Sequence, residues 1–540
     1  MIFGDVRKIN LSTSSFQQMI EGDCLYVDKS RLIEHFLNTA SSVQLVARQR
    51  RLGKSLNMDM LRCFLTDKED NRHLFKGLYI ENSSVWDKVN SAPVFYFDFK
   101  ELTAETYRIA LHDMVCDYME QYCDESHLSR QAKRYIKENN PNDAKGLRHL
   151  TEAVYKATGK RSYILIDEYD NLLMNNYTAD VYESIRLFAT TFLSSGMKGN
   201  QYLDKALLTG VMRVSHESML SGLNNMVTFD VFDDTVYQDD YGLTNKEVEM
   251  LYPLSPFDAD ELKMWYNGVK INGQEMYNIY SVMSFMVKKK HECYWGKSGT
   301  MSAMANLLND NRKLAIAKMM AGEKVTLPIS SKVSWQRLSN VTGDEAFYSI
   351  LVQSGYLSLE ESNVTTRTSL LAIPNKELMI AWKEFILDTV YENAPNVRTL
   401  FDNANDTDQF AADIEYFLTD KLSIHDLSAF KGEDARKVYE CVYHIFVLGI
   451  LSAYDDVRHQ RPVSNRESGN GRYDILVQKP EANYIFVFKA CIEGEDLHKF
   501  AQEALAQINT KRYGADLADG KPLIKIGIAL HGKQCKVVCA

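Results

Sequence analysis

One stretch of this chain decides how its fold is interpreted: Val43-Gln-Leu-Val-Ala-Arg-Gln-Arg-Arg-Leu-Gly-Lys-Ser-Leu-Asn57. Its apolar start predicts a buried strand, and the helix start that follows Gly53 predicts a phosphate-binding loop. In such a loop, backbone N–H groups and the helix N-terminus surround a triphosphate. We expect Lys54 to neutralise the β- and γ-phosphates and the Ser55 hydroxyl to ligate Mg²⁺.

The loop departs from the usual spacing G-x-x-x-x-G-K-[ST], because Arg48 stands where the first glycine is expected. A residue other than glycine tolerates positive φ poorly, so Arg48 gives the start of this loop less backbone freedom than glycine would. Gly, Lys and Ser also occur together in ordinary strand-to-helix loops. The loop alone therefore leaves nucleotide binding open. Gly53, Arg48, Arg50 and Arg51 are further residues expected near the nucleotide.

A second stretch, Arg161-Ser-Tyr-Ile-Leu-Ile-Asp-Glu-Tyr-Asp170, is an apolar run that ends in carboxylates. It is typical of a buried parallel strand, and ligands of α/β proteins bind at the carboxyl ends of such strands. We expect Asp167 to hold Mg²⁺, directly or through water, and Glu168 to polarise the attacking water. The alternative is a strand followed by a solvated acidic turn. The two stretches together favour a nucleotide site with a Walker A loop and a Walker B strand.

A third apolar run, Ala206-Leu-Leu-Thr-Gly-Val-Met-Arg213, ends in polar residues. Thr209 is placed to sense the γ-phosphate. Arg213 has two open interpretations: a charge-stabilising finger in cis, or an ion-pair partner of the Asp167 and Glu168 cluster.

Several segments now occur in a recognisable order. They are Tyr26-Val-Asp-Lys29, Arg50-Arg-Leu-Gly-Lys-Ser55, Ile166-Asp-Glu-Tyr-Asp170, Thr209-Gly-Val-Met-Arg-Val-Ser215, Ser221-Gly-Leu-Asn-Asn225, Trp265-Tyr-Asn-Gly268 and Tyr277-Asn278. In this order they resemble the predicted AAA-ATPase-like family of bacteria, whose members commonly carry a C-terminal PD-(D/E)XK nuclease-like domain. The resemblance implies an ATP-binding P-loop domain joined to a nuclease-type fold, and the missing first glycine belongs to that family's pattern.

The C-terminal region carries an incomplete version of a nuclease site. Asp474 and Lys489 are expected on neighbouring strands, the second of which is Asn483-Tyr-Ile-Phe-Val-Phe-Lys-Ala490. A metal-dependent nuclease of this kind uses Asp followed by Glu-x-Lys, in which two carboxylates hold Mg²⁺ and the lysine orients or activates water. Here Val487 stands in place of the glutamate. Because valine offers no oxygen to a hard cation, another acid must supply the ligand.

Glu467 is the preferred replacement for that ligand, and Glu440 is a second candidate. The segment Ala504-Leu-Ala-Gln-Ile-Asn-Thr-Lys-Arg-Tyr513 resembles the superfamily helix that carries a glutamine and a tyrosine, here Gln507 and Tyr513. The sequence thus leaves two alternatives for this domain: an active nuclease, or an inactive fold that binds nucleic acid.

Composition is that of an ordinary globular protein, with 540 residues, 45% hydrophobic and 25% charged. A net charge of −10 argues against a surface that tracks nucleic acid throughout, although His498-Lys499 and Lys511-Arg512 are local basic sites. Nine cysteines without a C-x-x-C pair predict reduced thiols, and the start of the chain lacks a signal pattern, so we expect a cytoplasmic location. The apolar run 442–453, which contains His444, is too short to cross a membrane.

The pattern along the chain predicts an α/β fold with four parts. Residues 1–235, with strands at 43–47, 93–98, 162–167 and 206–211, form a P-loop parallel sheet. Residues 236–300 form a helical lid that begins with a capped helix in Asp240-Tyr-Gly-Leu-Thr-Asn-Lys-Glu-Val248. Residues 301–430 form a mainly helical, winged-helix-like middle region with a hairpin over 356–374. Residues 431–540 form an α/β domain like that of restriction endonucleases.

The sequence therefore predicts an ATP-binding, Mg²⁺-dependent ATPase whose nucleotide state controls a nuclease-like domain acting on nucleic acid. One alternative is a nucleotide-switched binding or regulatory protein with an inactive nuclease fold, and another is a scaffold in which both sites are degenerate. ATP is the expected ligand, no membrane is expected as a partner, and DNA as a partner and the oligomeric state are left open.

Overall fold

The structure is a computed structural model of the chain. It describes residues 2–138, 140–176, 180–213, 223, 225–254, 256–295, 304, 307–320, 322–331, 343–363, 368–391, 406–421, 463–464, 467–468, 471–479, 481–492, 494–517, 520–531 and 534–540. Of the residues singled out above, Ser215, Ser221, Glu440 and His444, with the rest of the apolar run 442–453, lie outside the described residues. The chain divides into two compact units: Met1–Trp295 with Thr326–Glu377, and Gly296–Val325 with Leu378–Ala540.

The first unit is built on a five-stranded sheet whose strands are all parallel. The strands are β3 (Val43–Ala47), β4 (Val94–Asp98), β5 (Ser162–Asp167), β6 (Leu203–Gly210) and β7 (Met226–Phe229). Their spatial order is β4-β5-β6-β3-β7, so β6 lies between the strand that precedes the loop and the acidic strand. All residues of β3 and β5 are buried, as a sheet covered on both faces requires.

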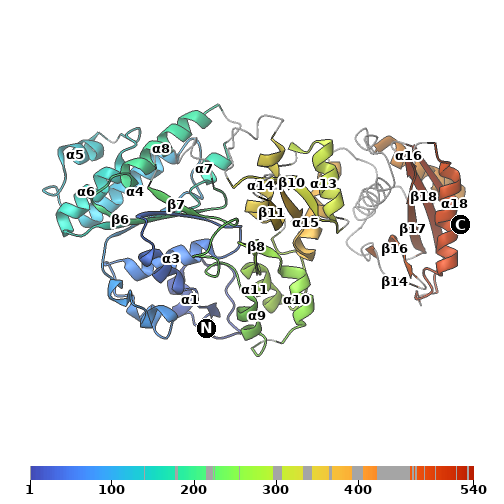
Figure 1. The fold of residues 1–540 in the computed structure, drawn as a ribbon, viewed down its shortest axis with the longest axis horizontal. Helices are drawn as coiled ribbons and strands as arrows, with labels where there is room; N and C mark the ends of the chain where they lie inside the picture. Colours follow the sequence, from blue (N-terminus) through green and yellow to red (C-terminus); the bar gives the residue numbers. More distant parts are fainter. Residues whose placement is uncertain are drawn as a thin grey trace. The chain divides into compact units, whose positions relative to one another are not determined.

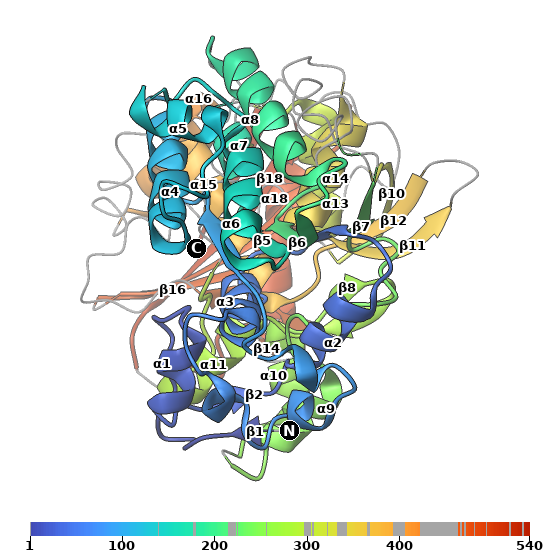
Figure 2. The same cartoon turned by 90° about the vertical axis from the view of Figure 1, so that its left-hand side faces the viewer.

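Helices cover both faces of this sheet (Figures 1 and 2). On one side lie α1 (Phe16–Glu21) and α3 (Lys54–Leu65), and on the other side lie α4 (Tyr107–Tyr122), α6 (Gly146–Thr158) and α8 (Tyr182–Met197). Shorter elements are β1 (Ile2–Phe3), β2 (Tyr26–Val27), α2 (Arg31–Asn38), α5 (Arg130–Lys137), α7 (Asn171–Met174) and 3₁₀ turns at Arg72–Phe75, Tyr79–Asn82 and Trp86–Lys88. The apolar face of α3 packs on Val46, Leu165 and Leu207 of the sheet.

The segment predicted as a lid contains three helices and a short hairpin. These are α9 (Asn245–Leu251), α10 (Ala259–Tyr266), β8 (Val269–Ile271), β9 (Gln274–Met276) and α11 (Ile279–Lys288). A capping box between Thr244 and Glu247 starts α9, which fits the capped helix expected from the sequence. Asn278 caps α11 by accepting a hydrogen bond from the backbone N–H of Ser281.

The expected hairpin after residue 356 is confirmed. Strands β11 (Ser358–Asn363) and β12 (Thr368–Ala372) pair antiparallel and join β10 (Val325–Pro328) in a three-stranded sheet. Helix α14 (Asp344–Ser354) immediately precedes the hairpin. The other helices of this part of the chain are α13 (Asp310–Met320), α15 (Lys376–Tyr391) and α16 (Thr407–Lys421).

The C-terminal sheet is mixed, with strand order β13-β16-β17-β18-β19. Its strands are β13 (Val463–Ser464), β16 (Ile475–Gln478), β17 (Asn483–Ala490), β18 (Leu523–His531) and β19 (Gln534–Cys539). Only β17 and β18 are parallel, and α18 (Leu497–Lys511) connects them and packs against both. At Gly527 of β18 a Cβ atom would lie 2.3 Å from the Ala501 carbonyl oxygen, so the helix backbone rests directly on the strand. A separate hairpin pairs β14 (Glu467–Ser468) with β15 (Gly471–Arg472).

Among the described residues, none of the helices combines the length and the apolar character that crossing a membrane requires.

Candidate functional site

The loop between β3 and α3 has the backbone geometry of a phosphate-binding turn. Gly53 is the N-cap of α3 and has φ +88°, and no side chain caps this helix. Arg51 also adopts positive φ, at +66°, whereas Arg48 is not among the residues with positive φ. The left-handed positions are therefore Arg51 and Gly53. This explains why the loop can form without a glycine at position 48. The first N–H groups of α3 lack side-chain partners and are suited to an anion.

The Lys54 side chain lies under the loop rather than in solvent. Its residue is 5% exposed, and its Nζ donates to the backbone carbonyl oxygens of Arg48 and Gln49, both at 3.2 Å. The same Nζ lies 3.7 Å from Oε1 of Glu168, at the end of the acidic strand. The structure thus brings together the lysine of the first motif and the glutamate of the second.

Strand β6 links these two motifs through Thr209. Thr209 is the register partner of Val46 on the adjacent parallel strand β3. Its Oγ1 donates to Oδ1 of Asp167 at 2.6 Å. Tyr96 of β4 approaches the other oxygen, with its hydroxyl 3.4 Å from Oδ2. Asp167 is 1% exposed. Its carboxylate is therefore fixed by neighbours on both adjacent strands.

Glu168 has a strained backbone at the same edge of the sheet. Its φ is +50°, and its backbone N–H donates to Oδ1 of Asp167 at 3.0 Å. Positive φ is costly for a residue with a side chain, and such strain is concentrated at functional positions. The turn directs the side chain, which is 25% exposed, toward Lys54. Of the three predicted acids, Glu168 is therefore the most accessible to water.

The third acid, Asp170, has a structural role that the sequence did not reveal. It is fully buried and accepts the backbone N–H groups of Val211 at 3.1 Å and Met212 at 2.9 Å, which fixes the turn after β6. Gly210 must be a glycine here, because a Cβ atom would lie 2.3 Å from Oδ1 of Asp170. Burial raises the pKa of Asp170 from 3.8 to about 7, and the nearby charge of Glu168 adds to the increase.

Arg213 does not pair with the Asp167 and Glu168 cluster. Its Nη1 lies 3.1 Å from Oδ2 of Asp230, a fully buried residue just beyond β7. Burial raises the pKa of Asp230, and the Arg213 charge opposes that rise. The ion-pair interpretation of Arg213 was therefore wrong about the partner, which is Asp230. The role of Arg213 as a charge-stabilising finger stays a prediction.

Arg48 occupies the position of the missing glycine and points into the protein. It is fully buried and pairs with Asp234, while its Nη1 donates to the carbonyl oxygens of Ala47 at 2.8 Å and Phe229 at 3.2 Å. Its guanidinium also lies 5.3 Å from the centroid of the Tyr241 ring. Burial lowers the pKa of Arg48 to about 10, so it remains charged at neutral pH.

Residues beyond β7 hold the loop in place. The backbone N–H of Gly242 donates to the Leu52 carbonyl oxygen at 3.0 Å, and the Asn57 side chain donates to the Asp240 carbonyl oxygen at 2.9 Å. Asp240 in turn lies 2.7 Å from Nδ1 of His35. The sequence alone gave no sign of these contacts, because residues almost two hundred positions apart make them.

Helix α11, which belongs to the segment predicted as a lid, contacts the same loop from its N-terminal end. The Asn278 side chain donates to the Arg50 carbonyl oxygen at 3.4 Å, and the Arg51 guanidinium lies 4.3 Å from the centroid of the Tyr280 ring. Arg51 is exposed and Arg50 is half-buried. The Nε of Arg50 is buried and has no hydrogen-bond partner within the described parts of the chain. Arg50 and Arg51, two of the three arginines predicted near the nucleotide, thus belong to the part of the loop that α11 contacts, whereas Arg48 is buried beside Asp234.

The residues present fit ATP and Mg²⁺. The loop supplies N–H groups and the Lys54 cation for phosphates, and Ser55 and Asp167 supply the oxygen ligands that Mg²⁺ prefers. Among the described residues, the buried Nε of Arg50 also lacks an acceptor. A cation donor of this kind at the loop is complementary to a phosphate oxygen.

The candidate nuclease site is less complete. Oδ2 of Asp474 accepts the backbone N–H of Phe488 at 2.8 Å, which fixes the carboxylate against β17. Val487 is 1% exposed and belongs to an apolar cluster with Ile485 and Ile508. Lys489 lies two residues further along the same strand, paired with Ala529 of β18. The position of the expected glutamate is thus part of the hydrophobic core beneath α18.

The other expected residues of that site are only partly placed. Glu467 lies on β14, paired with Arg472. Gln507 donates to the Tyr513 hydroxyl at 3.2 Å, so the two residues predicted on this helix do meet. Within the described parts of the chain, no group of three or more His, Cys, Asp and Glu side chains is arranged to hold a metal ion.

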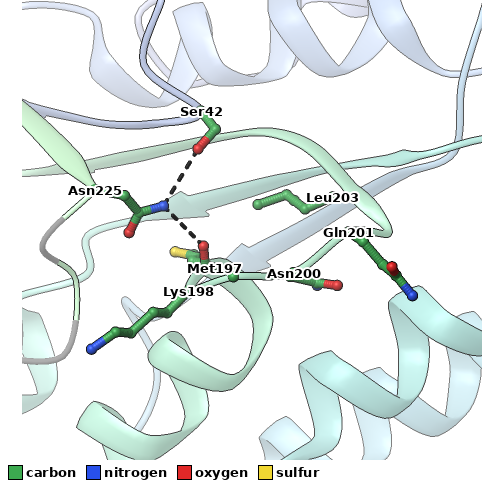
Figure 3. A pocket seen from close by; sticks show the side chains of 8 residues that line it. Ser42, Met197, Lys198, Asn200, Gln201, Leu203 and Asn225 are labelled. Atoms are coloured by element: carbon green, nitrogen blue, oxygen red, sulfur yellow. Dashed lines mark hydrogen bonds between the residues drawn. The ribbon is translucent and has the colours of Figure 1, made fainter.

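A pocket of about 660 Å³ lies at the opposite, amino-terminal edge of the first sheet (Figure 3). Ser42 precedes β3, and Asn200 and Gln201 precede β6. Asn225 closes one side by donating to Ser42 Oγ at 3.4 Å and to the Met197 carbonyl oxygen at 3.1 Å. Because ligands of parallel sheets bind at the carboxyl edge, this pocket is separate from the loop site.

Comparison with known proteins agrees with this architecture. Residues 10–220 match the model of a family described as predicted AAA-ATPase, and residues 438–539 match that of the PD-(D/E)XK nuclease superfamily. The chain therefore contains a predicted AAA-ATPase domain and, at its C-terminus, a domain of the PD-(D/E)XK nuclease superfamily. Both parts of the resemblance inferred from the sequence are confirmed.

Two similar proteins extend this comparison. The uncharacterized protein in the vnfD 5′ region of Azotobacter chroococcum is 25% identical over 98% of this chain and 98% of its own length. The Walker-type ATPase of Pyrococcus abyssi is 14% identical over 65% of this chain and 94% of its own, with a TM-score of 0.32. The class of fold, a P-loop-type parallel sheet followed by a nuclease-like α/β domain, rests on the family matches and the observed strand order.

Replacing Arg48 by Met should strongly destabilise the first unit, because Asp234 would remain as a buried, unpaired charge. We expect a loss of about 3–5 kcal/mol of unfolding free energy, measured by urea denaturation. Arg7→Met is the matched control, since the Arg7 side chain is 86% exposed in its pair with Asp5, and it should lower the unfolding free energy far less than Arg48→Met does. Adding Asp234→Asn to Arg48→Met should recover part of the loss. An equal effect of Arg48→Met and Arg7→Met would contradict the buried pair.

Stability should depend on pH through Asp170. Its pKa is raised in the folded state, so the folded protein holds this proton more tightly than the unfolded chain does. The contribution to stability is therefore fully present below pH 3.8 and is lost as pH rises through about 7. We expect the unfolding free energy of the wild type to fall relative to that of Asp170→Asn between about pH 4 and 7, while Asp117→Asn, on the exposed face of α4, follows the wild type. Parallel curves for Asp170→Asn and wild type would refute the assignment.

Proposed function

We propose that the first unit binds ATP with Mg²⁺ at the β3–α3 loop and hydrolyses it. The observation that carries this proposal is the convergence of Lys54 on Glu168, at 3.7 Å, beside the bond of 2.6 Å between Thr209 and Asp167. A cation, a polar sensor and two acids then meet at the carboxyl edge of a parallel sheet. The match of residues 10–220 to a predicted ATPase family supports the same activity.

Each residue has a distinct part in this proposal. The N–H groups from Gly53 onward and the Lys54 ammonium bind the phosphates, and on binding Lys54 exchanges its loop carbonyl partners for phosphate oxygens. Ser55 and Asp167 would hold Mg²⁺, which neutralises charge on the phosphates when bound. Glu168 orients the attacking water and Thr209 keeps the Asp167 carboxylate in position. Arg50, Arg51 and Arg213 are the further cations available to stabilise negative charge.

We propose that the nucleotide state of this site controls the C-terminal domain, which acts on nucleic acid. In this proposal residues 1–235 form the ATPase domain, 236–300 its lid, 301–430 the middle region and 431–540 the nuclease-like domain. Asp474 and Glu467 would hold the metal ion and Lys489 would act on water. The presence of both family domains in one chain supports a nucleotide-dependent activity.

A second candidate function is a nucleotide-switched binding protein with an inactive nuclease fold. Val487 favours it, because this side chain is buried in the apolar cluster under α18 instead of facing a metal site. Basic residues such as Lys499 and Arg512 could still contact phosphates in that case.

ATP turnover by the purified chain should require Lys54 and Glu168. We expect Lys54→Ala to weaken ATP binding and to reduce turnover at least about 100-fold, and Glu168→Gln to retain binding but lose turnover to a similar extent. Chelating Mg²⁺ should have the same effect on turnover. A matched control is Lys100→Ala, an exposed lysine just after β4. Turnover that persists in both site variants would exclude this site as the ATPase.

The two candidate functions differ in their response to Asp474→Ala. If the domain is a nuclease, DNA cleavage with Mg²⁺ or Mn²⁺ should be lost in this variant and be retained in Glu503→Ala, on the exposed face of α18. If the domain only binds, the wild type should not nick DNA but should bind it in a nucleotide-dependent manner. Cleavage that survives Asp474→Ala would show that the metal site is misassigned.

A further inference from the structure

The C-terminal end of α14 lies against the edge of the nucleotide site. Oε1 of Gln353 accepts the backbone N–H of Arg213 at 2.8 Å. Arg213 follows β6 by three residues, and the carbonyl oxygen of Gly210, the last residue of that strand, accepts the N–H of Arg48 at 3.0 Å. A side chain from the middle region thus binds the turn that carries the candidate finger.

A second contact joins the same end of α14 to the loop itself. Gly355 is the C-cap of α14 with φ +91°, and a Cβ atom there would lie 2.8 Å from Cγ of Gln49. The carbonyl oxygen of Gln49 is one of the two that hold Lys54. Trp295 and Tyr356 pack beside this contact, with ring centroids 5.3 Å apart. Two separate contacts therefore place the end of α14 on the β3–α3 loop and on the β6 turn.

Both glutamines are buried at some cost in hydrogen bonding. Gln353 is 1% exposed and Gln49 is 3% exposed. Nε2 of Gln353 and Oε1 of Gln49 are buried and have no hydrogen-bond partner among the described residues. Buried amides are normally satisfied on both sides, and apolar side chains of similar size would pack here without that penalty. Among the residues that the structure describes, the Gln353 amide provides the acceptor for the Arg213 N–H.

Arg213 is consequently held from two directions. Asp230 fixes its guanidinium from the segment after β7, and Gln353 fixes its backbone from α14. The side chain of Arg213 is 18% exposed, so it is neither fully buried nor free to sample solvent. A charge-stabilising residue needs such preorganisation, because its effect on turnover depends on being held close to one geometry.

The geometry points to Gln353 as a positioning residue of the ATP site. Through Gln353, helix α14 would influence ATP hydrolysis within the same chain. This inference rests on the proposed ATPase function. It gives the middle region, which lies between the two family domains in the sequence, a role in the turnover of ATP. It also makes the end of α14 a segment that senses whether the nucleotide site is filled, since the loop and the β6 turn both contact it.

Steady-state kinetics of full-length variants test this role. Gln353→Met has similar length but lacks the acceptor, and should lower kcat at least about 10-fold with KM changed less than about 3-fold. Gln353→Glu restores an acceptor oxygen and should return kcat to within about 3-fold of wild type. Ser354→Ala is the matched control, because the Ser354 hydroxyl is buried and bonds only within α14, to the Ile350 and Leu351 carbonyl oxygens. Unchanged kcat in Gln353→Met, or a loss that Gln353→Glu does not rescue, would overturn the inference.

Hydrogen exchange of the wild type gives a test that does not depend on the folding of any variant. Adding a non-hydrolysable ATP analogue with Mg²⁺ should slow exchange in peptides covering 48–60, 207–213 and 350–357 together. Slower exchange over 48–60 without any change over 350–357 would overturn the role of α14 while leaving ATP binding intact. No change in any of these peptides, together with no ATP turnover, would overturn the proposed function and, with it, this inference.

Discussion

The placement of β6 between β3 and β5 is the constraint on which the site depends. Parallel pairing in this order aligns the carboxyl ends of three strands, so that residues from three distant parts of the sequence meet. Thr209 on the central strand binds Asp167 on one neighbour, and the loop that follows the other neighbour brings Lys54 to Glu168. A shift in the register of β6 would move Thr209 away from Asp167 and break the link between the two motifs.

Buried charges stabilise the loops around that edge. The pair of Arg48 with Asp234 and the pair of Arg213 with Asp230 each connect the segment after β7 to a loop at the carboxyl ends of the strands. A buried ion pair adds little net stability compared with a pair of apolar side chains, but removing one partner leaves an isolated buried charge. These pairs therefore specify one arrangement of the loops. In this chain Arg48 performs at its position a structural task that a flexible glycine could not perform.

Much of this arrangement was predictable from the sequence because it follows from local pattern. The strands expected at 43–47, 162–167 and 206–211 correspond to β3, β5 and β6, since long apolar runs of this kind form buried parallel strands. The hairpin after residue 356 and the capped helix at Asn245 were equally clear. Strand β7 was missed, because Met226-Val-Thr-Phe229 is short and only Phe229 is buried, so it lacks the long apolar run of the other strands.

The partners of the site residues could not be predicted in the same way. Asp167, Glu168 and Asp170 are adjacent acids, and only the three-dimensional fold separates a carboxylate held by Thr209 from one that fixes the backbone of Met212. Arg213 was expected to pair, if at all, with the first two acids, whereas its partner is Asp230, which lies on a segment the sequence did not mark. Such pairings depend on tertiary contacts between residues far apart in the chain.

A structure of the full chain determined with a non-hydrolysable ATP analogue and Mg²⁺ would test the central claim most directly. The account predicts triphosphate density on the backbone N–H groups of Gly53 to Ser55, with Lys54 turned from its loop carbonyls to the phosphates. It also predicts the metal ion between Ser55 and Asp167. Nucleotide bound elsewhere, or a loop that stays closed over Lys54 at saturating nucleotide, would contradict it.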